Sequence, residues 1–437
     1  MVDQHAVPAS PRVPSAGVGP IQRFLSATEL DTRLLGMIGA LLLIWLGFHF
    51  LSGGVFLTPR NLWNLSVQTA SVAIMATGMV LVIVTRNIDL SVGSILGVVG
   101  MVMGVMQVDI LPRYLGLGHP AIWILTLGFG LVVGMGIGAL QGVIIAYLRV
   151  PAFIVTLGGY LIWRGAAWWV TSGRTVAPLD QTFQLMGGGP AGSIGFWASW
   201  AVGVLVCLGI VFGLYMGRRQ RHRFNFPQRP IWAEVTLGVL GCGVTLAAVA
   251  VANAYPWPSR IAETYAAAHD IPVPEGGLFI SHGIAIPVLI ALAAGVVMTF
   301  IATRTRFGRY VFAMGGNPEA AELAGINTRW VTVKIFILMG GLCALAAAIS
   351  SARLNAATNA LGTFDELYVI AAAVIGGTSL AGGMGTIVGA MIGALVMQSL
   401  QSGMVLLGID SPLQSIVVGI VLVLAVWLDT LYRRKAN

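Results

Sequence analysis

The stretch that decides the fold is Arg304 to Arg329, RTRFGRYVFAMGGNPEAAELAGINTR, which lies between two apolar runs long enough to cross a bilayer. Within it, Asn317 and Pro318 predict a helix start, because an N-cap Asn accepts a free backbone N–H and Pro is tolerated at the first helical position. Glu319 falls in the first turn, where the helix dipole favours anions, and Gly325 ends the helix. A helix of about two turns is not stable alone. It therefore needs a surface on which to dock.

Two interpretations of this short helix are open. It is either a polar connector with a capped turn, which is the commoner case, or a coupling helix that presses into a partner protein. For the second interpretation, the expected coupling residues are Gly315, Gly316, Asn317, Pro318, Glu319, Ala320, Ala321 and Gly325.

The composition predicts the environment of the chain. Of the 437 residues, 57% are hydrophobic and 9% are charged, and the mean hydropathy is +0.88, so the chain cannot cover a soluble globule with polar surface. The 57 glycines suit a membrane protein, in which small residues let helices approach closely. We therefore expect a polytopic membrane protein of the all-α class.

Apolar runs near the length of a bilayer crossing predict about 10 to 12 transmembrane helices, including one or two half-helices. The full-length runs lie at residues 34–52, 62–84, 90–108, 121–147, 152–171, 197–216, 231–254, 284–302, 331–352, 384–407 and 412–431. A shorter run at 367–380 predicts a half-helix, because Gly376 and Gly377 interrupt it.

The distribution of Lys and Arg predicts the orientation. If the N-terminus is cytoplasmic and twelve segments alternate, 18 of the 24 Lys and Arg residues face the inside, in agreement with the positive-inside rule. We expect a flexible cytoplasmic tail at 1–33 and a transmembrane domain at 34–437, with a cytoplasmic coupling loop at 303–330. The outer loop from Asn253 to His282 is either a connector or a surface for an extracytoplasmic partner.

The residues also restrict the energy source. A P-loop requires GxxxxGK[ST], and neither lysine, Lys334 or Lys435, stands in that pattern. Carboxylates lie almost wholly in loops or at helix ends, which disfavours a proton- or sodium-coupled carrier. The histidines and the three cysteines show no metal or catalytic spacing. We therefore expect no enzyme activity and no cofactor, and energy supplied by another chain.

Two breaks between apolar runs are candidates for the solute pathway, although a structural role is the commoner one for each of their residues. In the first break, Asp89 is expected to cap the next helix. In the second, unwound backbone is tolerated only against protein or a wet cavity. The candidate pathway residues are Gln68, Asn87, Asp89, Glu366, Gly376, Gly377, Thr378 and Ser379.

From about residue 55 to the end, the chain resembles the permease subunit of the ribose- and xylose-type sugar importers of the ATP-binding cassette (ABC) class. The matching stretches are RNIDLSVGSILG (86–97), VPAFIVTLGG (150–159), TRFGRYVFAMGGNPEAAELAGI (305–326) and IAAAVIGGTSLAGGMGTIVGAMIGAL (370–395). An inserted basic loop and extra helix at 217–283 are most similar to the xylose-type branch. One departure concerns Tyr368, where the family commonly has Asp, so the solute is left open.

The resemblance implies the ABC importer permease fold and its partners. These are cassette ATPase subunits, a periplasmic sugar-binding protein and a second permease chain, in the bacterial inner membrane. The implied function is passage of a neutral monosaccharide, such as the pentose xylose, by alternating access. Two alternatives are an ATP-independent facilitator and a permease of the same architecture for another sugar, a nucleoside or a branched-chain amino acid.

Overall fold

The computed structural model describes residues 25, 27–29, 32–274 and 276–436. In these residues the chain is built from helices, with isolated antiparallel bridges in place of strands. Nine of the described helices are long and apolar enough to cross a membrane. The expected all-α, polytopic fold is therefore confirmed, whereas most of the tail predicted at 1–33 lies outside the described residues.

The long helices are α2 (Thr32–Leu51), α3 (Pro59–Val84), α6 (Ile122–Ala146), α7 (Ala152–Trp169), α9 (Gly195–Arg223), α10 (Ile231–Asn253), α12 (Ile286–Arg304), α15 (Thr328–Leu354), α17 (Ile387–Leu406) and α18 (Ser411–Ala436). The shorter helices are α4 (Val92–Val105), α5 (Leu111–Leu115), α8 (Gln181–Gln184), α11 (Ser259–Ala268), α13 (Arg306–Gly316), α14 (Pro318–Leu323) and α16 (Asp365–Ile375). A π-helical segment, Met106–Ile110, joins α4 to α5, and a 3₁₀ turn, Leu185–Gly187, follows α8.

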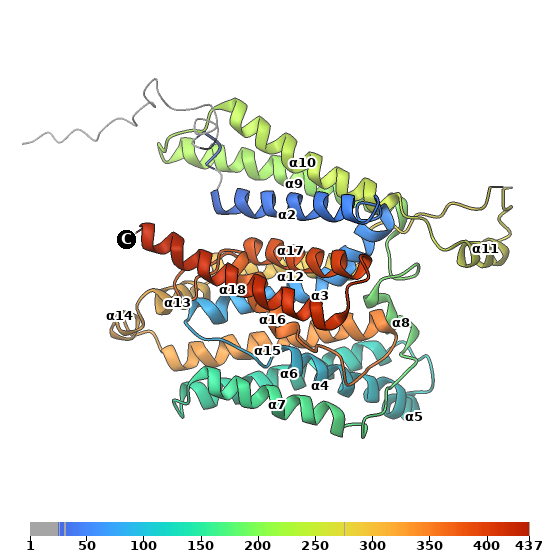
Figure 1. The fold of residues 1–437 in the computed structure, drawn as a ribbon, viewed down its shortest axis with the longest axis horizontal. Helices are drawn as coiled ribbons and strands as arrows, with labels where there is room; N and C mark the ends of the chain where they lie inside the picture. The colour runs from blue at the N-terminus through green and yellow to red at the C-terminus, as the bar shows by residue number, and fades with distance from the viewer. Residues whose placement is uncertain (1–24, 26, 30–31, 275, 437) are drawn as a thin grey trace, which may run out of the picture.

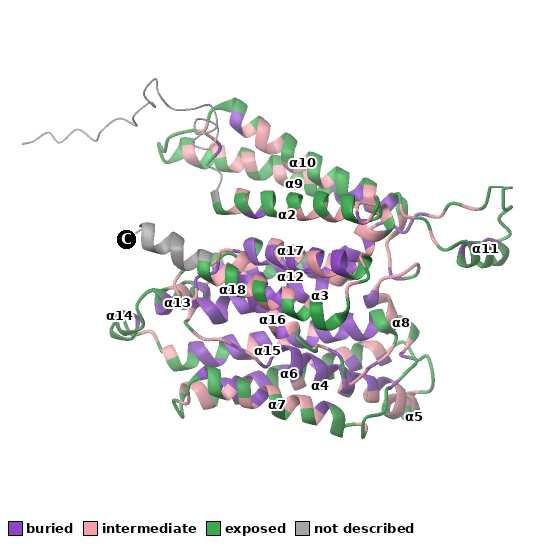
Figure 2. Cartoon of the chain, viewed as in Figure 1, coloured by how far each residue is buried: buried purple, intermediate pink, exposed green. Residues whose placement is uncertain are grey.

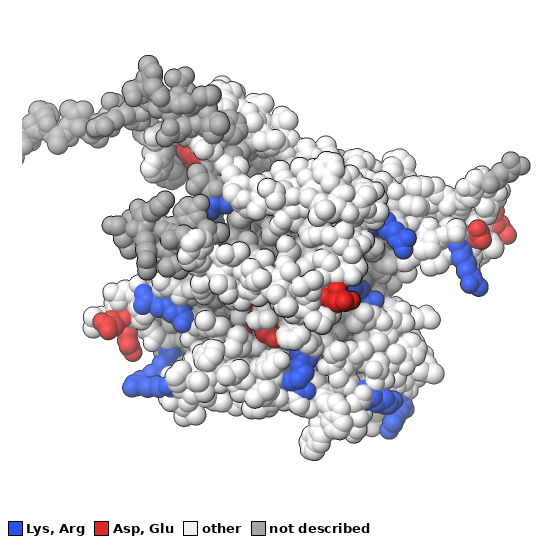
Figure 3. Space-filling model, in the orientation of Figure 1, with Lys and Arg blue, Asp and Glu red and all other residues white. Residues whose placement is uncertain are grey.

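The long helices run between two ends of the molecule (Figure 1). One end carries α13 and α14 and is called the inner end, and the other carries α5, α8 and α11 and is called the outer end. Figure 2 shows α3 and α15 largely buried, whereas α2, α9 and α10 are largely exposed on one side. Most of the face in Figure 3 is uncharged, and charged groups stand near α14 and on the arm that carries α11. Apolar helix faces of this kind are those that contact lipid.

Two helices begin inside the bundle instead of at one of its ends. After α3 reaches the inner end, residues 85–91 turn back as non-helical chain before α4 begins. After α15 reaches the outer end, residues 355–364 return through a series of turns before α16 begins. An added Cβ on Gly93 would overlap the carbonyl oxygen of Gly362 and Oε2 of Glu366, so the two helix starts touch. Two interrupted passes of opposite direction are typical of an inverted repeat.

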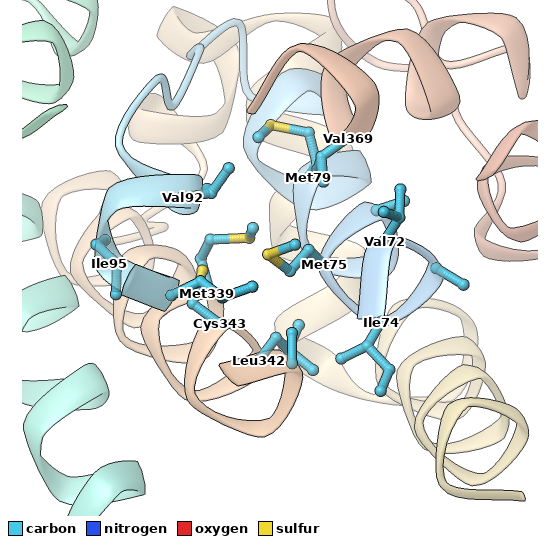
Figure 4. Close-up of a cluster of buried hydrophobic side chains, with 14 of the residues drawn as sticks. Val72, Ile74, Met75, Met79, Val92, Ile95, Met339, Leu342, Cys343 and Val369 are labelled. Atoms are coloured by element: carbon cyan, nitrogen blue, oxygen red, sulfur yellow. The ribbon is translucent and has the colours of Figure 1, made fainter. Parts of the chain in front are cut away.

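The core lies where these passes meet α3 and α15. Met75 and Met79 of α3 pack with Val92 of α4, Met339 of α15 and Val369 of α16, and all five side chains are buried (Figure 4). Unbranched methionines fill irregular gaps between helices that cross at different angles. This packing fixes the depth at which α4 and α16 begin.

Three boundaries differ from those predicted. The half-helix predicted at 367–380 is Asp365–Ile375, because a Schellman motif ends it: the N–H of Gly377 donates to Val374 O (2.9 Å) and that of Thr378 to Ala373 O (3.0 Å). The run at 90–108 becomes α4, which begins only at Val92 after the N-cap Ser91, and a π-helical segment, Met106–Ile110.

The third difference lies at the inner end of α9, which continues through Arg223. The first part of the predicted basic loop at 217–283 is therefore helical. Arg221 and Arg229 bond to Glu29 at 2.6 and 2.8 Å, and these bonds lower the pKa of Glu29 to about 2.

Candidate functional site

The inner end presents α14 as a capped and exposed helix. The side chain of Asn317 accepts a hydrogen bond from the N–H of Ala320 (3.0 Å), as the sequence predicted for the N-cap. Gly325 has a φ of +81° and follows the last turn, which is the conformation that glycine tolerates best. Within α14 only Ala321 is buried, and the apolar side chain of Leu323 is 91% exposed. The helix therefore rests on the bundle through one small side chain and leaves an apolar one free.

Behind α14, two glycines join it to the interrupted pass of α3 and α4. Arg86 donates from Nε to the carbonyl oxygen of Gly315 (3.1 Å) and from Nη2 to that of Gly316 (2.9 Å). An added Cβ on Gly315 would overlap the carbonyl oxygen of Val84. Because Arg86 belongs to segment 85–91, a displacement of α14 acts directly on that segment.

The non-helical segment 85–91 is held by side chains along its length. Oδ1 of Asp89 accepts from the N–H (2.9 Å) and the hydroxyl (2.6 Å) of Ser91, immediately before α4 begins. Gln141 of α6 bonds to the same hydroxyl (3.0 Å), and Thr156 of α7 donates to Ile88 O (3.1 Å). Asp89 thus closes a turn before α4 and does not cap the helix itself: the N-cap residue is Ser91, and no side chain of the described residues bonds to the first N–H groups of α4, so the cap predicted for Asp89 is wrong. The side chain of Asn87 donates to Thr85, and its N–H donates to Val82 O (3.2 Å).

The returning segment 355–364 is held by an arginine from the middle of α7. Arg164 donates to the carbonyl oxygens of Asn359 (3.2 Å), Leu361 (2.8 Å) and Gly362 (3.0 Å). Glu366 follows this segment, and its Oε2 is buried without a hydrogen-bond partner among the described residues. The three bonds from Arg164 thus satisfy carbonyl groups of the turns before α16 inside the bundle.

A cavity of about 620 Å³ opens at the outer end. It lies between the start of α3, the segment from α8 to residue 192, and the end of α15. Its polar lining consists mainly of amides and contains Asn64, Gln68, Gln181, Gln184, Arg353 and Asn355. Trp63 and Val67 supply apolar surface beside them. Amide groups both donate and accept hydrogen bonds, so this lining can satisfy a neutral ligand rich in hydroxyl groups.

The structure separates the predicted pathway residues into three places. Gln68 lines the outer cavity, and its Oε1 accepts from Gln398 (3.4 Å). Asp89 lies just before the start of α4, with Asn87 two residues earlier, and Glu366 lies at the start of α16. Gly376, Gly377, Thr378 and Ser379 end α16, where an added Cβ on Gly376 would overlap the backbone of α17. Tyr368 is buried on α16 and is absent from the described lining of the cavity.

Several residues of the site were missed by the sequence analysis. Arg164 stands inside an apolar run, and an intramembrane arginine is itself a signal of function. The cavity residues Gln181, Gln184 and Asn355 lie in connectors whose placement no periodicity predicts.

An apolar bundle with two interrupted helices, an outer cavity and an exposed inner helix defines a membrane transport protein rather than an enzyme. The family model for "Branched-chain amino acid transport system / permease component" matches residues 61–426. The chain therefore belongs to this family of permeases.

Individual relatives cover nearly the whole chain. It is 37% identical over 415 residues to the xylose transport system permease protein XylH of Escherichia coli strain K12, covering 94% of this chain and 95% of that protein. The corresponding protein of Haemophilus influenzae is 36% identical, covering 91% and 96%. The ribose import permease protein RbsC of E. coli K12 is 33% identical, covering 86% and 87%. No solved structure matches the chain.

Proposed function

We propose that the chain is the membrane-spanning subunit of an ATP-driven importer in the bacterial inner membrane. It passes a neutral monosaccharide, most simply the pentose xylose, by alternating access. Separate cassette ATPases supply the energy, a periplasmic binding protein delivers the sugar, and two permease chains form the pathway. The permease subunit itself catalyses no reaction.

The observation that carries this proposal is that the exposed helix α14 is attached to segment 85–91, the interruption between α3 and α4. The free surface of α14 includes Leu323 and Glu319, and Arg86 links the end of α13 to the segment 85–91. A push on α14 is thereby passed to the start of α4, which touches Gly362 and Glu366 at the start of α16. A nucleotide in a partner shifts the two conformers only through different contacts with each, so α14 docks differently in the two states.

The cavity supports a neutral polyol as the solute. Its described lining offers amides and one cation, Arg353, without a carboxylate. An amino acid zwitterion needs a partner for its ammonium group as well as for its carboxylate, because a buried charge without a partner is costly. A pentose needs only hydrogen bonds, which Gln68, Gln184 and Asn355 can give. The two sugar permeases among the relatives support the same choice.

The test is uptake of radiolabelled xylose into proteoliposomes that contain the permease, its ATPase subunits and the sugar-loaded binding protein. We expect uptake only with ATP, and a loss of at least fivefold in Glu319→Arg and in Gly325→Pro with normal membrane insertion. Equilibration of xylose without ATPase subunits would support a facilitator instead. A thermal-shift screen of the binding protein against pentoses, hexoses and amino acids separates sugar from other solutes.

A further inference from the structure

Residues 254–274 and 276–282 form an arm that projects from the outer end of the bundle (Figures 1 and 2). Backbone hydrogen bonds close its base: Trp257 N–H donates to Ile280 O (2.7 Å) and His282 N–H donates to Tyr255 O (3.0 Å). The outgoing and returning segments of the arm are therefore hydrogen-bonded to each other where they leave the bundle.

The arm carries exposed apolar side chains away from the membrane-spanning helices. Within α11, Ala262 and Ala266 are buried, whereas Ile261 is exposed. Phe279, on the returning part of the arm, is 64% exposed. Both side chains stand outside the bundle, where a partner protein can reach them.

A series of ring contacts runs from the arm to the bundle. Tyr265 of α11 meets Trp257 edge-on at 5.5 Å, and Trp257 meets His282 at 6.5 Å. His282 is stacked on Tyr255, with ring centroids 4.3 Å apart and planes 1° apart. Trp63 of α3 completes the series, 4.8 Å from His282. His282 and Trp63 are both buried, so this cluster of rings is a packed junction.

The junction is part of the wall of the outer cavity. Trp63 lines the cavity, and its Nε1–H donates to the carbonyl oxygen of Gly283 (2.8 Å). On the opposite side of the base, Ile286 N–H donates to Gly192 O (2.9 Å), and Gly195 N–H donates to His282 O (3.0 Å). Because Gly192 also lines the cavity, a displacement of the arm moves two parts of its wall.

We propose that the arm is the docking element for the solute-binding protein, and that the junction of Trp63, Tyr255 and His282 transmits docking to the cavity wall. This inference rests on the proposed function and adds the surface and the route. A protein that delivers a solute to the cavity must dock beside its mouth, and Gly283 and Ile286, which directly follow the arm, bond to Trp63 and Gly192 of the cavity lining.

The docking surface is tested with the permease and its ATPase subunits in lipid nanodiscs and the xylose-loaded binding protein. Ile261→Asp and Phe279→Asp are expected to weaken binding at least tenfold. The control Leu117→Asp alters a side chain that is 92% exposed in the connector between α5 and α6, outside the arm, and is expected to leave binding within twofold. Equal binding by both arm variants, or equal weakening by Leu117→Asp, would overturn the docking role.

The transmission step is tested by stimulation of ATPase activity. Tyr255→Leu removes the stacked ring, and we expect unchanged basal ATPase activity, an affinity within twofold of the original, and maximal stimulation reduced at least fivefold. Tyr255→Phe keeps the ring and is expected to behave as the unaltered chain. If Tyr255→Leu does not fold, Trp257→Leu interrupts the same series one ring further out. Full stimulation in a folded ring variant would overturn the transmission role.

These experiments distinguish a failure of the proposed role of the arm from a failure of the proposed function. If the unaltered permease shows no stimulation by the binding protein, the proposed function fails, and the role of the arm fails with it. If the unaltered chain is stimulated and the arm variants are stimulated equally, only the role of the arm fails.

Discussion

Arg86 binds the carbonyl oxygen of Gly315 through its Nε–H, at 3.1 Å, and so joins the second residue after α3 to the last turn of α13. A second bond from the same guanidinium reaches Gly316, one residue before the N-cap of α14. Bonds from a charged donor to backbone oxygen are stronger than neutral ones. This link is the most direct route by which a push on α14 reaches the interior.

The first prediction concerns this link. Arg86→Met removes both bonds, and we expect ATP-driven uptake to fall at least fivefold while ATP hydrolysis continues, because the two events are no longer joined. The control is Arg309→Met, since Arg309 is exposed on α13 and, within the part of the chain that the structure describes, makes no hydrogen bond to segment 85–91. Uptake and hydrolysis are measured in the same vesicles. Unchanged uptake per ATP in Arg86→Met would show that the link carries no force.

The second prediction concerns the contact of the two helix starts. Gly93→Ala places a methyl group against the carbonyl oxygen of Gly362, and backbone atoms cannot move aside as a flexible side chain can. We therefore expect the free energy of unfolding to fall by about 1–3 kcal/mol or more, and uptake to be at least tenfold slower. Gly128→Ala is the control, because nothing lies within 4 Å of an added Cβ there. Thermal unfolding in detergent measures stability. Equal unfolding temperatures in both variants would contradict the tight contact.

Sequence predicted the outline of this architecture well. The apolar runs predicted most of the long helices because a bilayer imposes a minimum length on each crossing. Asn317 and Gly325 gave both ends of α14, because capping depends on residues local in sequence.

The meeting of segments 85–91 and 355–364 could not be predicted, since it depends on pairs such as Gly93 and Gly362 that are 269 positions apart. The cavity was missed for the same reason. Gln68 was found because it is polar inside an apolar run, whereas Gln184 and Asn355 lie in connectors where polar residues are ordinary.

The third prediction concerns Arg164. Arg164→Met removes three hydrogen bonds to the returning segment 355–364, and we expect a loss of about 2–4 kcal/mol, because each bond to a charged donor contributes about 1.5–3 kcal/mol and part of this is recovered by water. The control is Arg174→Met, whose ion pair with Asp109 is exposed and contributes about 1 kcal/mol or less. Chemical denaturation of the two variants in micelles gives the difference. Equal losses would show that Arg164 does not hold the segment.

The fourth prediction concerns pH. Burial among rings at the base of the arm lowers the pKa of His282, so the folded protein favours the neutral ring. The free energy of unfolding is therefore highest above the ordinary histidine pKa of about 6.5 and decreases as the pH falls below that value. The reason is that the unfolded chain then binds a proton on His282 that the folded chain does not bind. Thermal unfolding between pH 8 and pH 5 measures this. His282→Gln is expected to reduce the change of the unfolding temperature between pH 8 and pH 5. The same change in the variant as in the unaltered chain would contradict this prediction.

The central claim is that ATP-driven movement enters the permease at α14, and Leu323→Asp tests it most directly. Leu323 is 91% exposed, so the change leaves the fold intact and puts a charge on the docking surface. The measurement is ATP-dependent xylose uptake by vesicles that contain the ATPase subunits and binding protein, with Leu117→Asp at the outer end as the matched control. The account predicts at least tenfold lower uptake for Leu323→Asp and normal uptake for Leu117→Asp. Normal uptake by Leu323→Asp would contradict it.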